Sequence, residues 1–351
     1  MENIKHSIEN RFFIREEKNG ITVYERSSNL FNFYEGITWN DVVNSGVSNA
    51  DDFEDFLESI SDRISINIDS KYPFNINWLI EDKCNLDCIY CFADDKFYLD
   101  RDRDSISTAK SILRLNSLTV GITGGEPTLN PDIDKIIEMF AGKIAITIDT
   151  NGTTPKIIKL IPLLKKANVM VRITIDTVDN DLLNKLRPPK HMPEGGYDQV
   201  GILTKNIKAL VDAGVPVMVH TVLTKLNINK TEDIAETLID LGVKRWHLYG
   251  VNYAEKCKHF FEKIKVTKKE VSDNKELLLS KYGDEINITH SLEDDFSANA
   301  VVLINSNGEF FVDTITDGIR YIGQNPKKPT IEELAEYLNY DRHADCYLTF
   351  Y

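Results

Sequence analysis

Three cysteines close together in the chain, Cys84, Cys88 and Cys91, constrain it more than any other feature. Thiolates are soft ligands that suit zinc or iron-sulfur clusters. A structural zinc site needs four ligands in a closed tetrahedron, and the histidines nearest in sequence are His6 and His191. A four-iron cluster held by three thiolates, with one iron left open, needs no distant fourth ligand. The spacing therefore favours an iron-sulfur cluster, with zinc as the alternative.

Composition and charge narrow the class of protein. The 351 residues, 42% of them hydrophobic, are enough to bury a full core, and the formal net charge of -14 disfavours binding to nucleic acid. The 5 cysteines are an odd number, and residues 1–10 are polar and charged, without an apolar signal segment. No apolar run approaches the length of a membrane span. We expect a cytoplasmic protein that contacts neither nucleic acid nor a membrane.

A second motif, Gly124-Gly125-Glu126-Pro127, follows the cysteines. Together with the triplet, and with Tyr90 just before its last cysteine, this motif resembles the radical S-adenosylmethionine (SAM) superfamily. The resemblance implies two cofactors, a 4Fe-4S cluster on the three cysteines and SAM, and an external electron donor of the flavodoxin or ferredoxin type. It also implies reductive cleavage of SAM to methionine and a 5′-deoxyadenosyl radical, which removes a hydrogen from a substrate.

The middle of the chain alternates strand and helix patterns, which predicts an α/β fold with a parallel sheet. The predicted strands cover 74–80, 117–122, 144–148, 169–175, 217–223 and 246–251. The predicted helices cover 133–140, 156–165, 199–213 and 233–241. Six strand-helix units correspond to the partial (βα)6 barrel that the resemblance implies.

Functional groups of parallel barrels collect at the carboxyl ends of the strands. The resemblance places the SAM contacts there, at Tyr90, Gly124, Gly125, Glu126, Thr150, Asn151, Asp176, Arg187, Val222 and Leu223. It implies that the glycines let the backbone approach the methionyl amino group, that Arg187 pairs with the methionyl carboxylate, and that Asp176 binds a ribose hydroxyl. Without the resemblance, Asn151 marks a turn, Asp176 a helix cap and Arg187 a surface charge.

We predict three domains: a small N-terminal α+β unit at 1–72, the barrel at 73–252 and a C-terminal extension at 253–351. The first contains three strand patterns followed by a helix pattern with Phe53 and Phe56 on one face. It is similar in outline to leader-peptide recognition domains, which add an extended peptide to a sheet edge. A plain capping extension is the alternative.

The C-terminal extension predicts a β-hairpin around Asn307-Gly308 and then a helix near 331–338. Outside the triplet only Cys257 and Cys346 remain, too few for a second cluster. The resemblance therefore implies a cluster-free remnant of a SPASM-like or twitch-like extension that closes the barrel. Some relatives return a hydrogen atom from a thiol, which makes Cys257 and Cys346 candidate catalytic residues, Cys346 if its tail folds over the barrel mouth. The alternative is that each is a small buried hydrophobe.

Other features give weaker signals. His220 and Tyr249, near the ends of the fifth and sixth strands, are candidates to line the substrate pocket, although a core or rim position is the simpler interpretation. The acidic run Glu293-Asp294-Asp295 predicts a solvated loop.

Three functions are compatible with these features. The first is a radical SAM enzyme that modifies a ribosomally made peptide. The second is a viperin-like radical SAM enzyme that acts on a nucleotide or another small molecule, although Met218 stands where a phosphate-binding lysine is expected. The third is a non-catalytic iron-sulfur sensor or electron carrier, which has no need of Glu126 or Arg187.

Overall fold

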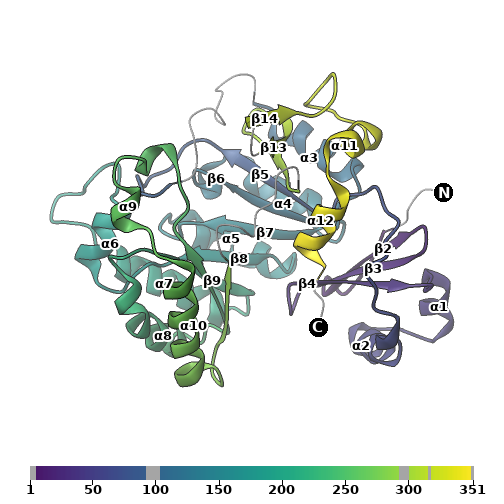
Figure 1. Cartoon of the computed structure of the whole chain (residues 1–351), viewed down its shortest axis with the longest axis horizontal. Coiled ribbons are helices and arrows are strands. Elements are labelled where there is room, and N and C mark those ends of the chain that lie inside the picture. Colours follow the sequence, from purple (N-terminus) through teal and green to yellow (C-terminus); the bar gives the residue numbers. More distant parts are fainter. Residues whose placement is uncertain (1–4, 92–102, 292–299, 315–317, 349–351) are drawn as a thin grey trace.

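The computed structural model describes residues 5–91, 103–291, 300–314 and 318–348 (Figure 1). The described residues form a large mixed sheet with helices packed on it and a smaller antiparallel sheet. No helix among them combines the length and apolar character that crossing a bilayer requires. The predicted solvated loop at Glu293-Asp294-Asp295 lies outside the described residues.

The large sheet has the strand order β11-β10-β9-β8-β7-β6-β5-β12-β13-β14. Its strands are β5 (Asn75–Glu81), β6 (Thr119–Gly124), β7 (Ala145–Thr150), β8 (Met170–Thr174), β9 (Val217–Leu223), β10 (Arg245–Gly250), β11 (Asn287–Ser291), β12 (Val302–Ile304), β13 (Phe310–Thr314) and β14 (Gly318–Tyr321). Strands β5 to β11 are parallel, as the alternating pattern predicts, and the α/β fold with six strand-helix units is confirmed.

Two parts of this sheet differ from the prediction. β11 is a seventh parallel strand beside β10, and its pattern is too polar to stand out in the sequence. The predicted hairpin is present as β12 and β13, but β12 pairs in parallel with β5 and extends the sheet. The expectation that the C-terminal segment closes the barrel is therefore wrong: in the described residues the sheet is open, with β11 and β14 at its edges.

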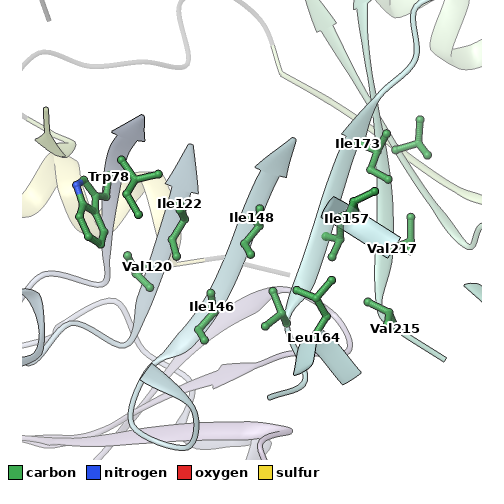
Figure 2. Close-up of a cluster of buried hydrophobic side chains, with 14 of the residues drawn as sticks. Trp78, Val120, Ile122, Ile146, Ile148, Ile157, Leu164, Ile173, Val215 and Val217 are labelled. Carbon is green, nitrogen blue, oxygen red and sulfur yellow. The ribbon is translucent and has the colours of Figure 1, made fainter. Parts of the chain in front are cut away.

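Helices cover the apolar face of the parallel strands. They are α3 (Ser105–Arg114), α4 (Ile133–Phe140), α5 (Lys156–Lys166), α6 (Asn180–Leu186), α7 (Gln199–Asp212), α8 (Thr231–Asp240) and α10 (Lys268–Tyr282). The short helix α9 (Phe261–Ile264) packs instead in a cluster with Tyr90 and Val222. Figure 2 shows how Ile122 on β6 and Ile148 on β7 lie in a row and how Ile157 of α5 packs near them. Because side chains alternate along a strand, the other face of these strands is left for polar residues.

The N-terminal unit is a four-stranded antiparallel sheet with two helices. Its elements are β1 (Lys5–Ile8), β2 (Phe12–Glu17), β3 (Gly20–Glu25), β4 (Leu30–Glu35), α1 (Trp39–Asn44) and α2 (Ala50–Ser59). β1 was not predicted. One face of the sheet packs on α1 and α2 through Ile14, Val23 and Phe53, and the other packs on the large sheet through Phe13 and Phe33. Both faces are thus buried, which explains why nearly every residue of β2 and β3 is buried.

The chain returns at its C-terminal end to the amino ends of the parallel strands, through α11 (Ile331–Tyr337) and α12 (Tyr340–Tyr347) (Figure 1). The His343 side chain on α12 is fully buried, accepts a hydrogen bond from Phe74 N at 2.8 Å and lies 2.5 Å from Ala300 O. Arg15 of β2, also buried, donates to Pro73 O at 2.7 Å. These contacts join the N-terminal unit, β5 and the C-terminal helices into one packed layer.

Candidate functional site

The loop that carries the three cysteines leaves the carboxyl end of β5 and is fixed against the segment after α6. Asp87 N donates to Pro188 O at 2.7 Å and Ile89 N donates to Leu186 O at 2.9 Å. These backbone contacts hold Cys88 next to Arg187, which follows α6 directly. The sequence showed no helix at α6, so this pairing could not be predicted from it.

The two glycines of the second motif make room for this same loop. A Cβ atom on Gly124 would lie 2.4 Å from Glu81 O, and one on Gly125 would lie 2.4 Å from Lys83 O. Gly125 N donates to Glu81 O at 2.6 Å. The need for glycine is thus already explained by the contact between β6 and the cysteine loop, and an approach to a methionyl amino group stays a prediction.

Glu126 joins the carboxyl ends of β6 and β7. Its fully buried carboxylate accepts hydrogen bonds from Thr128 N at 3.0 Å, Thr128 Oγ1 at 2.6 Å, Thr150 Oγ1 at 2.7 Å and Asn151 N at 2.8 Å. Burial raises the pKa of Glu126, and the four donors act in the opposite direction. The carboxylate therefore acts as a structural bracket that positions Thr150 and Asn151.

Asn151 connects that bracket to the cysteine loop. Its Nδ2 donates to Asn85 Oδ1 at 2.8 Å and lies 3.6 Å from Cys84 Sγ, and its Oδ1 accepts from Thr153 N at 2.9 Å. Cys84 Sγ also accepts a hydrogen bond from Leu86 N at 3.4 Å. Burial raises the pKa of Cys84, whereas these two donors favour its thiolate. A ligand thiolate at this position would keep two N–H donors, the kind of outer contact that orients metal ligands.

Tyr90, Asp176 and Arg187 form a buried network beside the cysteines. The Tyr90 hydroxyl donates to Asp176 Oδ2, Val222 N donates to Asp176 Oδ1 at 2.7 Å, and Arg187 Nε lies 3.9 Å from Asp176 Oδ2. Burial raises the pKa of Asp176, and Arg187 opposes that shift. The sequence predicted all three residues at the site, and the structure brings them together.

The Arg187 guanidinium interacts electrostatically with the middle cysteine, Cys88. It donates to Thr174 O and, at 3.3 Å, to Asn151 O, and only 2% of the residue is exposed. Burial acts against its charge, but Cys88 and Asp176 raise the pKa of Arg187 overall. Burial raises the pKa of the Cys88 thiol to about 12, and Arg187 opposes that rise. The charged guanidinium thus favours the thiolate that a cluster ligand needs.

A polar group lies on the face of β7 to β11 that the helices leave open. Arg172 pairs with Asp149, and the rings of His247 and Tyr249 lie 4.4 Å apart, with His220 5.1 Å from Tyr249. Burial lowers the pKa of His220 and raises that of Tyr249. His220 and Tyr249 were candidate pocket residues in the sequence. Arg172, Asp149 and His247 were missed, although their alternation with buried apolar residues was visible.

The predicted adenine contacts Val222 and Leu223 lie on opposite faces of β9. Val222 packs near Tyr90 in an apolar cluster that also holds Cys257, whereas Leu223 is fully buried in the main core. The structure therefore brings Val222 but not the Leu223 side chain to the site. Cys257 is fully buried in that cluster, and its thiol lies 3.3 Å from Ala254 O.

Cys346 lies at the opposite end of the strands. It is an exposed residue of α12, the helix that contacts Phe74 at the amino end of β5. The described residues do not meet the condition that would bring Cys346 to the barrel mouth, because Tyr347 and Leu348 pack against the N-terminal sheet and the start of β5. This placement separates Cys346 from the cysteine triplet.

The donor set fits an iron-sulfur cluster. The three cysteines are all outside disulfides and influence one another's ionisation electrostatically. In the described part of the chain, no three His, Cys, Asp or Glu side chains converge closely enough to share one metal ion. A four-iron cluster takes each thiolate on a different iron, so its ligands need not meet at one point.

A family model described as the Radical SAM superfamily matches residues 78–240. Among curated proteins, the GTP 3′,8-cyclase of Clostridium acetobutylicum is 35% identical over 179 residues, 46% of this chain and 52% of that protein. The subtilosin biosynthesis protein AlbA of Bacillus subtilis is 28% identical over 184 residues, 49% of this chain and 38% of that protein. The chain spans about half the length of the curated relatives it matches.

Solved structures share the fold over most of the chain. SuiB of Streptococcus suis bound to SAM has a TM-score of 0.64 at 16% identity, covering 90% of this chain and 85% of that one. SuiB bound to its precursor peptide SuiA has a TM-score of 0.61 at 16% identity, covering 88% of this chain and 82% of that one. Residues 78–240 therefore match the radical SAM superfamily, whose members use a 4Fe-4S cluster and SAM.

Proposed function

We propose that the chain is a radical SAM enzyme that acts on a peptide, with an external electron donor of the flavodoxin or ferredoxin type. The observation that carries the radical chemistry is the convergence of the cysteine loop, the Glu126 bracket and the Tyr90–Asp176–Arg187 network at the carboxyl ends of β5 to β8. A cluster protein that only senses or carries electrons does not need this constellation.

Each group at the site has a distinct proposed role. Cys84, Cys88 and Cys91 would hold the cluster. When bound, the cluster and SAM supply a carbon-centred radical by reductive cleavage of the sulfonium. Arg187 offers the buried cation for a carboxylate, a task that suits the planar fork of guanidinium. Because Glu126 already accepts four protein donors, we assign it a positioning role and assign the methionyl amino group to backbone carbonyls of the motif.

The N-terminal unit supports a peptide as the substrate. β1 is an edge strand that pairs only with β2 in the described residues, and a cavity of about 380 Å³ lies between β1 and α1. Trp39, Val42 and Val43 line this cavity, and the rings of His6 and Trp39 stack at 3.7 Å. An extended peptide added to β1 would gain main-chain hydrogen bonds and place alternate side chains in the cavity. The similarity to SuiB, which was solved with a precursor peptide, agrees with this assignment.

A nucleotide substrate is the second candidate. The similarity to GTP 3′,8-cyclases favours it. Two residues of the open face weigh against it: the charge of Arg172 is already matched by Asp149, and Met218 offers no cation for a phosphate. We therefore place the peptide first.

Cys257 stays a candidate hydrogen-atom donor, since it packs in one cluster with Tyr90 and Val222. Under this proposal, Cys257→Ala leaves SAM cleavage intact but removes solvent-derived deuterium from the product made in heavy water. Unchanged deuterium incorporation in the variant would exclude the thiol as the donor.

The radical chemistry is tested by anaerobic reconstitution, reduction with dithionite and addition of SAM. We expect 5′-deoxyadenosine from the native chain and from Cys346→Ala, and none from Cys88→Ala. Equal, negligible product from all three proteins would contradict the assignment. Cys346 is a suitable control because it is a cysteine that lies at the other end of the strands.

The substrate class is tested by following 5′-deoxyadenosine release in the presence of peptides encoded by short reading frames beside the gene, or of nucleoside triphosphates. A peptide should stimulate release in the native chain, with a mass change on the peptide. Val43→Asp in the β1 cavity should abolish the stimulation, whereas Leu277→Asp, a comparably exposed apolar residue on α10, should not. Stimulation by a nucleotide alone would replace the peptide assignment.

A further inference from the structure

A second cavity, of about 400 Å³, lies at the end of the barrel opposite the cysteines. Its walls come from the N-terminal unit, at Arg11 and Arg26, and from the segments that lead into β8, β9 and β10. Pro216 and Val243 form part of its apolar wall, and Lys244 and Arg245 bring further positive charge. The cavity therefore collects four cationic side chains where the two sheets meet.

Arg26 is buried in this wall with one donor unused. Only 2% of the residue is exposed, and its Nη2 donates to Ile146 O at 2.6 Å while Nη1 lies 3.4 Å from Tyr24 Oη. Its Nε is buried and has no hydrogen-bond partner. Burial lowers the pKa of Arg26. The guanidinium is held in place by two contacts, and its Nε–H has no partner and is left for a ligand.

Arg245, at the start of β10, also has a guanidinium nitrogen without a hydrogen-bond partner. Its Nη1 is buried and has no partner, and its pKa is lowered by burial and, to a lesser degree, by Arg26. Within the described residues, neither Arg26 nor Arg245 has a carboxylate at ion-pair distance. Glu25, the acid that acts on Arg245, lies 3.7 Å from Arg11.

Arg11, in the wall of the same cavity, differs from Arg26 and Arg245 because it forms ion pairs with carboxylates. It pairs with Asp51 at 3.1 Å and with Glu54 at 2.5 Å, in addition to Glu25. Two like charges without such partners, Arg26 fully buried and Arg245 partly so, are unfavourable, because their buried N–H groups lose water without gaining an acceptor. An oxyanion between Arg26 and Arg245 would supply the missing acceptor to both through charge-assisted hydrogen bonds.

We propose that this cavity binds the phosphate group of a small molecule. A phosphate monoester carries a charge close to two at neutral pH and several acceptor oxygens, which matches two guanidinium groups with Lys244 at the rim better than a single carboxylate does. The bound group would link Arg26, which follows β3, to Arg245 on β10. It would thus tie the N-terminal unit to the barrel.

The test is isothermal titration of the whole chain with inorganic phosphate and with acetate, at constant ionic strength in chloride. We expect one phosphate per chain and binding of acetate at least about tenfold weaker. Arg245→Gln should weaken phosphate binding by roughly tenfold or more, because it removes hydrogen bonds to a charged group. Arg114→Gln, an exposed arginine on α3, should bind as the native chain does.

Thermal melting separates binding from a structural role of Arg245. Without phosphate, Arg245→Gln should melt no lower than the native chain, since it removes a partly buried cation whose Nη1 has no partner. Phosphate should raise the melting temperature of the native chain and leave that of the variant unchanged. Absence of phosphate binding to the native chain overturns the proposal, whether or not the variant folds. Equal binding by native chain and variant, or equal binding of acetate and phosphate, overturns it as well.

Discussion

The two ends of the parallel strands are both polar and buried, but they satisfy their polar groups in different ways. At the amino ends, Arg15 and His343 bond mainly to backbone atoms, such as Pro73 O and Phe74 N. At the carboxyl ends, the Asp176 carboxylate accepts a hydrogen bond from the Tyr90 hydroxyl and lies 3.9 Å from Arg187 Nε. Backbone partners are always present in the folded chain, whereas side-chain partners depend on each other's charge.

This difference separates the residues that hold the fold from those that prepare a site. Removing a residue at the amino ends leaves a backbone group unpaired, which lowers stability. Removing one at the carboxyl ends leaves a charge unpaired next to the cysteines, which changes both stability and the ionisation of Cys88.

The largest effect is expected from Arg187→Met. The variant leaves Asp176 as a buried carboxylate without its cation, and loss of one partner of a buried pair costs about 3–5 kcal/mol. Urea unfolding of the metal-free protein under reducing conditions measures the change. Adding Asp176→Asn to the variant should restore part of the loss. A loss below about 1 kcal/mol would show that the pair is weakly coupled.

The buried side chain of His343 should make the free energy of unfolding depend on pH. Burial lowers the pKa of His343 from 6.5 to about 4, so the unfolded chain takes up a proton between these values that the folded chain does not. Stability should therefore be complete above pH 6.5 and should fall by about 3 kcal/mol as the pH drops to 4. Unfolding free energies of the native chain and His343→Asn across this range measure the effect. The same slope in both proteins would refute this role of His343.

Gly125→Ala tests the contact between β6 and the cysteine loop. Its new Cβ would lie 2.4 Å from Lys83 O, so we expect a loss of about 1–3 kcal/mol and displacement of Cys84. Gly250→Ala, at the end of β10, is the matched control because its Cβ would meet nothing closer than 3.8 Å. Equal unfolding free energies for the two variants would show that the loop yields without cost.

The smallest effect is expected from Glu126→Gln. An amide cannot accept hydrogen bonds at both of its terminal atoms, so at least one of the four donors loses its partner at a cost of about 1–2 kcal/mol. Chemical unfolding should show this loss, and it should be absent from Glu138→Gln, an exposed glutamate on α4. An unchanged free energy of unfolding in Glu126→Gln would mean that the Glu126 carboxyl is already protonated in the native chain.

Much of the fold could be predicted because its signals are local. The strands from β5 to β10 show apolar runs, and the helices α4, α5, α7 and α8 show helical periodicity, so each could be read without knowledge of its partners. β11 and α6 were missed because they are short and polar. The pairing of β12 with β5 joins residues far apart in the sequence, and no local pattern specifies such a partner.

The site residues, like the elements of the fold, could be predicted where the sequence carries a local signal. The cysteines, Glu126 and Arg187 stand in recognisable motifs, and the structure brings them together. The bracket around Glu126 and the cation beside Cys88 depend on contacts between different strand ends, which single motifs do not contain. Cys346 was misplaced for the same reason, since its position depends on where α12 docks.

The central claim is that the carboxyl ends of the strands hold a cluster through three thiolates. Its most direct measurement is the iron and sulfide content after anaerobic reconstitution, combined with electron paramagnetic resonance of the reduced protein with and without SAM. We predict about four irons per chain in the native protein and in Cys346→Ala, a spectrum that changes when SAM is added, and loss of the cluster in Cys88→Ala. A protein that retains one zinc and assembles no cluster, or a spectrum that SAM leaves unchanged, would contradict the account.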